Sequence, residues 1–279
     1  MNLAETLLSA GMTPPKTFRV GRWLRFPGVG KGPRNRAGWC RMVTPTLAIY
    51  GDFSSNLRAV WTDANHKDDD SSREALQRAR EQAKQQWFEE RERQRQVAKQ
   101  GEELLRAATC MQHTYLATKG FPEMQGLCFG DQLLVPVRDV REQNIINVQH
   151  IAPDGTKKFM VGGRARFGIH RLGALRANRT LLCEGYATGL SLYEAAKRLW
   201  SGVRVVVCFS AGNLECVACE FPGALVCADN DLSGCGERTA KATGLKWVMP
   251  AVGGTDFNDL HVSCGLFAVV TKLREATMS

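Results

Sequence analysis

Three carboxylates follow two short hydrophobic runs, and this placement constrains the fold of the chain more than any other feature. Glu184 follows the run TLLC and precedes GYATGLSLYEAA, whereas Asp229 and Asp231 follow the run ALVCA and precede LSG. Runs that are apolar on both faces predict fully buried strands of a parallel sheet. Ligands of open α/β sheets bind outside the carboxyl ends of the strands. We therefore expect the three carboxylates at one ligand-binding edge of a sheet.

The residue types at this edge indicate a metal-dependent phosphoryl-transfer site. Neighbouring carboxylates repel one another unless a cation lies among them, and Mg²⁺ takes carboxylate, water and phosphate oxygens as ligands. A single Asp after a strand is also an ordinary helix N-cap, and each of the three residues alone fits that role. A Glu and an Asp-x-Asp at two strand ends within one βαβ-length region favour the metal site.

The C-terminal part, residues 178–279, alternates hydrophobic runs with helical patterns. This alternation predicts an α/β fold with a parallel sheet covered by helices on both faces. The expected strands are 180–183, 203–209, 224–228 and 245–249, and the expected helices are 187–199, 212–220, 235–244 and 257–274.

The preceding residues divide into three further segments. Residues 1–61 predict a small β-rich module, residues 62–109 a long, charged and largely solvated connecting helix, and residues 110–177 a basic subdomain with several strands. Residues 1–60 hold nine Lys or Arg against two acidic residues, and so carry seven of the nine net positive charges of the chain. This asymmetry indicates a polyanion-binding N-terminal module, although a basic surface that only keeps the protein in solution has the same composition.

The ten cysteines do not indicate a secreted disulfide scaffold. The N-terminus lacks the features of a signal peptide and no 18-residue apolar run exists, so we expect a cytoplasmic protein that does not bind a membrane. Cys183, Cys208 and Cys227 lie in predicted buried strands, where cysteine packs as a small hydrophobe. Cys216 and Cys219 form a Cys-x-x-Cys without a convincing second pair, so no zinc is expected.

Four segments, taken in order, resemble the Toprim domain of DNA primases encoded by plasmids, phages and other mobile elements. They are LLCEGYATGLSLYEA, VVVCFSAGNL, ALVCADNDLSG and GGTDFNDLH, and the resemblance covers residues 110–265. Residues 16–61 are also similar to the module that precedes Toprim in such primases. In the bacterial replicative primase that module is a zinc ribbon. Here Cys40 is the only cysteine in the module, so the resemblance implies a metal-free equivalent.

The resemblance implies a role for each acidic residue. Glu184 matches the first-motif glutamate, and Asp229 and Asp231 match the Asp-x-Asp that holds Mg²⁺ or Mn²⁺ during nucleotidyl transfer. Glu184 either ligates metal or takes the proton of the attacking 3′-hydroxyl. Asp256 either helps to position a second ion or caps the following helix.

Basic residues before the Toprim segment correspond to a primase subdomain that binds nucleotide and template backbone. The residues expected to do so are Lys157, Lys158, Arg164, Arg166 and Arg171, with Lys158 and Arg164 as the preferred pair; a solvated basic hairpin is the alternative. In the N-terminal module, basic residues interleaved with Trp23, Phe26 and Trp39 suit single-stranded template with base stacking, unless these aromatic residues form the module's core. These basic residues are Arg25, Lys31, Arg34, Arg36 and Arg41.

The resemblance therefore implies a DNA primase that makes short RNA primers from NTPs on single-stranded DNA, with a helicase supplied by another protein. A Toprim nuclease is one alternative, and a non-catalytic single-stranded DNA-binding protein of a mobile element is another. A topoisomerase is disfavoured because its nucleophilic Tyr requires a separate domain, which is not evident in this sequence.

Overall fold

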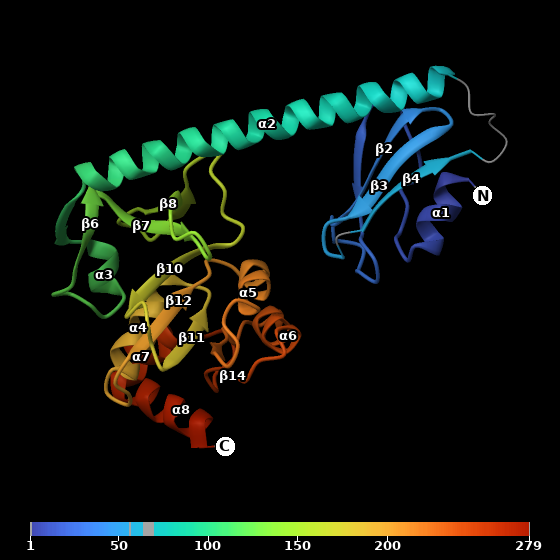
Figure 1. Cartoon of the computed structure of the whole chain (residues 1–279). Coiled ribbons are helices and arrows are strands. Elements are labelled where there is room, and N and C mark those ends of the chain that lie inside the picture. The colour runs from blue at the N-terminus through green and yellow to red at the C-terminus, as the bar shows by residue number, and fades with distance from the viewer. Residues whose placement is uncertain (1, 56, 64–69, 279) are drawn as a thin grey trace. The chain divides into compact units, whose positions relative to one another are not determined.

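The computed structural model describes residues 2–55, 57–63 and 70–278, without the side chains of residues 70–76, 79, 80 and 83. The chain divides into two compact units, Met1–Glu89 and Glu90–Ser279, and helix α2 (Asp70–Ala107) contributes to both (Figure 1). The structure confirms an α/β fold preceded by a β-rich module and a long helix. The division of the chain into four segments at the predicted boundaries stays a prediction.

The N-terminal unit is built on a four-stranded antiparallel sheet in the order β1-β2-β3-β4. Helix α1 (Leu3–Ser9) packs its buried Leu3 and Leu7 in one cluster with residues from one face of the sheet, Phe26 and Cys40 among them. Phe26 is therefore a core residue. The strands are β1 (Trp23–Phe26), β2 (Gly38–Thr44), β3 (Leu47–Asp52) and β4 (Leu57–Thr62).

A glycine in β3 determines how the opposite face of this sheet packs. A Cβ atom at Gly51 would lie 2.2 Å from the carbonyl oxygen of Leu57 and 2.6 Å from Cζ2 of Trp39. Gly51 is also the register partner of Trp39 on the neighbouring strand. The absence of a side chain at Gly51 therefore lets the Trp39 indole lie close against the sheet.

The second unit is built on a ten-stranded mixed sheet. Its main path is β14-β13-β11-β12-β10-β7-β6-β5, and β8 and β9 continue from β7. The antiparallel strands are β5 (Thr109–Gln112), β6 (Gln125–Phe129), β7 (Gln132–Asp139), β8 (Ile145–Ile151), β9 (Lys157–Phe159) and β10 (Gly168–Gly173), with α3 (Thr114–Thr118) between β5 and β6. Because β10 pairs with β12, the 110–177 region and the C-terminal part share one sheet.

The C-terminal part of this sheet is parallel, as predicted. Its strands are β11 (Arg179–Cys183), β12 (Val203–Val207), β13 (Leu225–Cys227) and β14 (Trp247–Val248), and its helices are α4 (Tyr186–Ala196), α5 (Ala211–Ala218), α6 (Cys235–Ala242), α7 (Phe257–Cys264) and α8 (Leu266–Met278). The single helix expected over 257–274 is wrong. Gly265 has a φ of 80° and ends α7, so that α8 begins as a separate helix.

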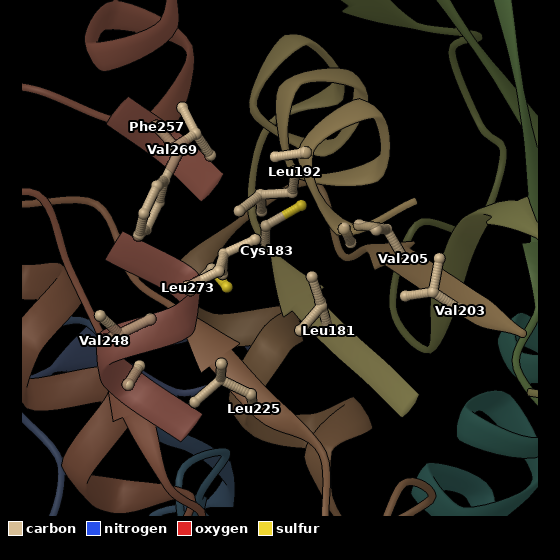
Figure 2. Packing of buried hydrophobic residues seen from close by; sticks show 14 of the residues in the cluster. Leu181, Cys183, Leu192, Val203, Val205, Leu225, Val248, Phe257, Val269 and Leu273 are labelled. Carbon is tan, nitrogen blue, oxygen red and sulfur yellow. The ribbon is translucent and has the colours of Figure 1, made fainter. Parts of the chain in front are cut away.

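Alternate residues of the buried strands fill two separate cores. Leu181, Val205 and Leu225 pack with Leu192 of α4 and Leu273 of α8 (Figure 2). The intervening strand residues pack against α5 and α6, which lie on the other side of the sheet (Figure 1). Burial on both faces explains why these strands are continuously apolar in sequence.

The cysteines predicted to be structural are buried: Cys183, Cys208 and Cys227 have no exposed surface. All ten cysteines are free thiols. No helix within residues 2–55, 57–63 and 70–278 is both long and apolar enough to cross a membrane.

The close approach at Gly51 yields a stability prediction. We expect Gly51→Ala to lower the free energy of unfolding by about 1–3 kcal/mol, because a Cβ there must displace the Leu57 carbonyl and the Trp39 ring. Gly32→Ala is the matched control, since a Cβ at Gly32 meets no atom within 4 Å. Urea denaturation followed by tryptophan fluorescence measures both variants. Equal stability of the two variants would contradict this account of the Trp39 packing.

Candidate active site

Glu184 lies directly after β11, where the chain turns into α4. Its backbone oxygen accepts a hydrogen bond of 2.8 Å from the amide of Phe209, which follows the neighbouring strand with a φ of 68°. Its half-buried carboxylate accepts a hydrogen bond from the Ala211 amide at the start of α5. Burial raises the pKa of Glu184; the Ala211 amide opposes this shift and the charge of Asp231 adds to it. Glu184 is thus a carboxylate with increased proton affinity at a strand end.

Asp231 closes the turn between β13 and α6. Its carboxylate accepts hydrogen bonds from the Ser233 hydroxyl, from the Cys235 amide at 3.1 Å and from the Gly236 amide at 2.6 Å. These donors lower the pKa of Asp231 to about 2. Asp231 therefore satisfies free amides at the N-terminus of α6, which was the alternative role for an Asp at this position.

Asp229 has a different environment only two residues away. Burial raises the pKa of Asp229 to about 7, and the charges of Glu184, Asp256 and Asp231 add to the shift. Its Oδ1 atom is buried and has no hydrogen-bond partner. The Asp229 backbone packs closely against α6, because a Cβ at Gly236 would lie 2.0 Å from the Asp229 carbonyl oxygen. The fold therefore holds a desolvated carboxylate among like charges.

Asp256 is both the N-cap of α7 and a neighbour of Asp229. Its Oδ1 accepts hydrogen bonds from the amides of Asn258 (2.6 Å) and Asp259 (2.8 Å), and Asp259 completes a capping box. Its Oδ2 accepts a hydrogen bond of 2.9 Å from the hydroxyl of Thr188 in α4. The sequence reading did not identify Thr188, and it contained no signal for this contact, which spans 68 residues.

The acidic cluster, defined as Glu184, Asp229, Asp231 and Asp256, fits a divalent cation by its chemistry. All its side chains offer hard oxygen donors. The unpartnered Oδ1 of Asp229 and the repulsion that raises its pKa are both relieved by a bound cation. In the part of the chain that the structure describes, no group of three or more His, Cys, Asp or Glu side chains is already arranged to hold a metal ion. Cation binding therefore requires side-chain reorientation within the cluster.

Strand β9 places basic and aromatic groups beside the acidic cluster. Lys157 is an exposed residue of β9 and interacts electrostatically with Asp256 and Asp229. Protein atoms around its ammonium group partly desolvate it and lower the pKa of Lys157. Its Nζ lies 5.5 Å from the centroid of the Tyr115 ring. Phe159 stacks edge-on against Phe209, with ring centroids 5.5 Å apart. Lys157 and Phe159 of β9 therefore border the cluster.

The other basic residues predicted in this region have separate surroundings. Lys158 is exposed on β9, opposite His150. Arg164 forms an ion pair with Asp139, which leaves it largely committed to a structural contact. Arg166 lies over the ring of Phe167, and Arg171 donates to the side chain of Gln143. The structure thus brings Lys157 to the acidic carboxylates, and it does not show Lys158 and Arg164 acting as a pair there.

The N-terminal unit carries a second group of predicted residues. Lys31 and Arg34 are exposed in the loop between β1 and β2. Arg25 and Arg36 hold this loop to β1, because the Nε of Arg25 donates to the Arg36 carbonyl (2.8 Å) and Nη1 of Arg36 donates to the Arg25 carbonyl (3.0 Å).

An aromatic row lies on the sheet face opposite α1, and we define it as Trp23, Trp39 and Phe53. Ring centroids are 5.4 Å apart between the two Trp residues and 5.8 Å apart between Trp39 and Phe53. Trp23 and Phe53 are about half exposed, whereas Trp39 between them is buried. Arg41 lies over Trp23 and Arg25 lies over Phe53. The Nε atom of Arg41 is buried without a hydrogen-bond partner.

Comparison with known proteins identifies the C-terminal part of the chain. Residues 179–266 match the Toprim domain family model, which confirms the Toprim resemblance for these residues. DNA primase TraC of Escherichia coli is 30% identical over 130 residues. That match covers 42% of this chain and 9% of TraC, so most of TraC lies outside the aligned region.

Three solved primase structures match parts of the chain, each with a TM-score below 0.5. One match is to the primase domains of bacteriophage T7, solved in a complex of the lagging-strand DNA polymerase with an RNA/DNA hybrid and dTTP. The identity is 12% and the TM-score is 0.44, and the match covers 62% of this chain and 93% of the T7 chain. The primase fragment of the T7 primase-helicase matches at 12% identity with a TM-score of 0.39, over 51% and 62%. A DNA primase domain from Pseudomonas aeruginosa matches at 16% identity with a TM-score of 0.34, over 58% and 56%.

The contrast between the two aspartates of the turn yields a pH-dependent prediction. The pKa of Asp229 is about 7 in the folded chain, so its ionisation destabilises the fold progressively from about pH 4 to pH 7. We expect Asp229→Asn to raise the melting temperature at pH 8 in EDTA by several degrees, an effect that disappears near pH 4. Scanning calorimetry across this pH range measures the shift.

Asp231→Ala is the control, and we expect it to change the melting temperature at pH 8 in the opposite direction. The pKa of Asp231 is lowered to about 2, so its ionised carboxylate stabilises the fold above about pH 4 and loses this effect as the pH falls towards 2. The variant should therefore melt at a lower temperature than the parent at pH 8. A destabilised Asp229→Asn at pH 8 would show that the buried carboxylate is not under repulsion.

Proposed function

Because residues 179–266 form a Toprim domain, we propose that the chain is a DNA primase, which synthesises short RNA primers on single-stranded DNA by metal-dependent nucleotidyl transfer. The observation that carries this proposal is the desolvated Asp229 carboxylate, which lies among like charges and beside Lys157. Such a site is suited to a cation and a polyphosphate together. The relative TraC is named a DNA primase, which supports the same assignment.

Mg²⁺ or Mn²⁺ would be held by oxygens of Asp229 and Asp231, with Glu184 and Asp256 as the further candidate ligands. The ion supplies charge neutralisation at the transferring phosphate and the leaving pyrophosphate. Asp231 and Asp256 already accept hydrogen bonds from helix amides, so an ion would have to share their oxygens with these amides. Asp229 contributes the unpartnered oxygen.

The residues around the cluster would bind the nucleotide and move the proton. Glu184 has a raised pKa, and its carboxylate would either ligate the ion or accept the proton of the primer 3′-hydroxyl. Lys157 would bind phosphate oxygens of the incoming NTP, and the neighbouring Lys158 would extend this positive charge along β9. Phe159 and Phe209 supply an apolar border that limits water at the site.

The aromatic row of the N-terminal unit would bind the unpaired template. Exposed aromatic faces stack with bases of any sequence, and neighbouring arginines bind the backbone phosphates. The half-exposed rings of Trp23 and Phe53, with Arg41 and Arg25 over them, supply both kinds of contact. Exposed Lys31 and Arg34 add further positive charge in the adjacent loop.

Substitution of the acidic cluster tests the catalytic proposal. We expect Glu184→Gln and Asp229→Asn each to reduce primer synthesis at least a hundredfold, because each removes a carboxylate from the cluster. Circular single-stranded DNA with labelled NTPs and Mg²⁺ provides the assay, in which the products are sized. Glu237→Gln is the matched control, since Glu237 is an exposed residue of α6 paired with Lys241.

Three results of this assay have different meanings. Loss of synthesis in both variants, with retained DNA binding and with a fully active control, supports the proposal. Degradation of labelled single strands with Mg²⁺ but without NTPs would identify a nuclease. Primer synthesis by both purified variants would overturn the site assignment.

Binding to abasic DNA tests the role of the aromatic row. We expect the Trp23→Ala, Phe53→Ala double variant to bind oligo(dT) about tenfold or more weakly than the parent, since each stacked base contributes about 1–3 kcal/mol. Its affinity for an abasic strand of equal length should be unchanged, because that strand offers phosphates without bases. Fluorescence anisotropy measures both affinities.

Phe267→Ala is the control for a lost exposed aromatic residue, because Phe267 lies on α8 at 69% exposure. Parent-like binding of oligo(dT) by the double variant would show that the row does not stack with bases.

A further inference from the structure

Three arginines from neighbouring strands lie on one face of the central sheet. Arg138 of β7 pairs in register with Ile169 of β10, and Arg204 of β12 pairs with Gly173 of β10. Arg171 lies midway between these two β10 residues. Because side chains alternate along a strand, Arg138, Arg171 and Arg204 all project from the same face.

These arginines are held by uncharged acceptors. Nη1 of Arg138 donates to the backbone carbonyl of Gln143 at 2.9 Å, and Arg171 donates to the side-chain oxygen of the same residue. Nε of Arg204 donates to the Thr180 hydroxyl at 2.8 Å, and its guanidinium group lies 5.0 Å from the centroid of the Phe221 ring. The three groups are thus oriented by the fold, and their charge is not neutralised by these contacts.

No carboxylate with a described side chain forms an ion pair with any of the three. Glu220, the acidic residue next to Phe221, is already paired with Arg141. The Nε atom of Arg171 is buried and has no hydrogen-bond partner. Burial lowers the pKa of Arg171, and the charges of Arg204 and Arg138 lower it further. A partly buried positive group with like neighbours and an unused donor is costly unless an anion compensates it.

We propose that Arg138, Arg171 and Arg204 form a binding site for a phosphate group, separate from the acidic cluster. Arginine binds tetrahedral phosphate oxygens through its planar fork of donors, and several arginines around one phosphate are a common solution. The three arginines lie on β12, β10 and β7, whereas the acidic cluster follows the C-terminal ends of β11 and β13, on the other side of β12 in the sheet. The phosphate belongs either to a free polyphosphate or to the backbone of a nucleic acid.

Anion binding by the full-length chain in EDTA tests this site without any contribution from a metal ion. The probe is inorganic pyrophosphate at constant ionic strength, measured by calorimetric titration and by thermal shift. We expect Arg171→Gln to bind pyrophosphate about tenfold or more weakly than the parent, because it removes one charged donor group of three. Without pyrophosphate the variant should melt at the same temperature as the parent or higher, because repulsion among the arginines is relieved.

Two further variants keep the test decisive. Arg138→Gln changes the exposed member of the trio and should also lose pyrophosphate affinity, so a folding defect of Arg171→Gln would not obscure the result. Arg274→Gln is the control, since Arg274 is exposed on α8, the helix that packs against the opposite face of the sheet.

An abasic oligonucleotide distinguishes the two sources of phosphate. If both trio variants lose affinity for the abasic strand and the parent binds pyrophosphate weakly, the site binds a nucleic-acid backbone. If both variants lose affinity for pyrophosphate and bind the abasic strand like the parent, the site binds a free polyphosphate. Parent-like binding of both probes by Arg138→Gln and Arg171→Gln would overturn the proposal. An equal loss in Arg274→Gln would also overturn it, because the effect would then be general electrostatics.

Discussion

The site in this chain depends on the desolvation of one carboxylate among others of the same charge. Asp229 follows a strand that is buried on both faces, so its position is imposed by the packing of the sheet. The close approach of Gly236 to its carbonyl keeps the turn tight, and burial with neighbouring charges raises the pKa of Asp229 to about 7. Folding energy from the two hydrophobic cores therefore maintains an electrostatically unfavourable arrangement, which a cation would make favourable.

The sites proposed on the two units differ in their chemistry. The aromatic row presents π-faces and arginines on an open sheet, which suits unpaired bases. The second unit presents carboxylates beside Lys157 at one end of its parallel strands and uncompensated arginines on the sheet face that includes the other end of β12. Bases, metal-bound phosphates and the phosphate of the arginine site would thus be bound by separate groups, so each site can be tested without disabling the others.

Local patterns made much of this architecture predictable. Continuous apolar runs predicted the parallel strands, and the carboxylates after them predicted the position of the acidic cluster. Non-local contacts were not predictable. Arg164, between β9 and β10, is committed to Asp139 at the end of β7, and Phe53 joins Trp23 and Trp39 only through the register of β1, β2 and β3. The break at Gly265 was missed because the apolar periodicity continues from α7 into α8, and a positive φ at a glycine leaves no mark on that periodicity.

Asp256 shows how folding and ligand affinity become interdependent in such a site. One of its oxygens closes the first turn of α7, and the other anchors α4 through Thr188. An ion bound by Asp256 would compete for these oxygens with the hydrogen bonds to α7 and to Thr188. Tighter ion binding and stronger attachment of the two helices can therefore not be improved independently at this residue. Neither Thr188 nor Asp259 is itself a candidate ligand. Substitution of either residue would nevertheless change the ion affinity, because both form hydrogen bonds with Asp256.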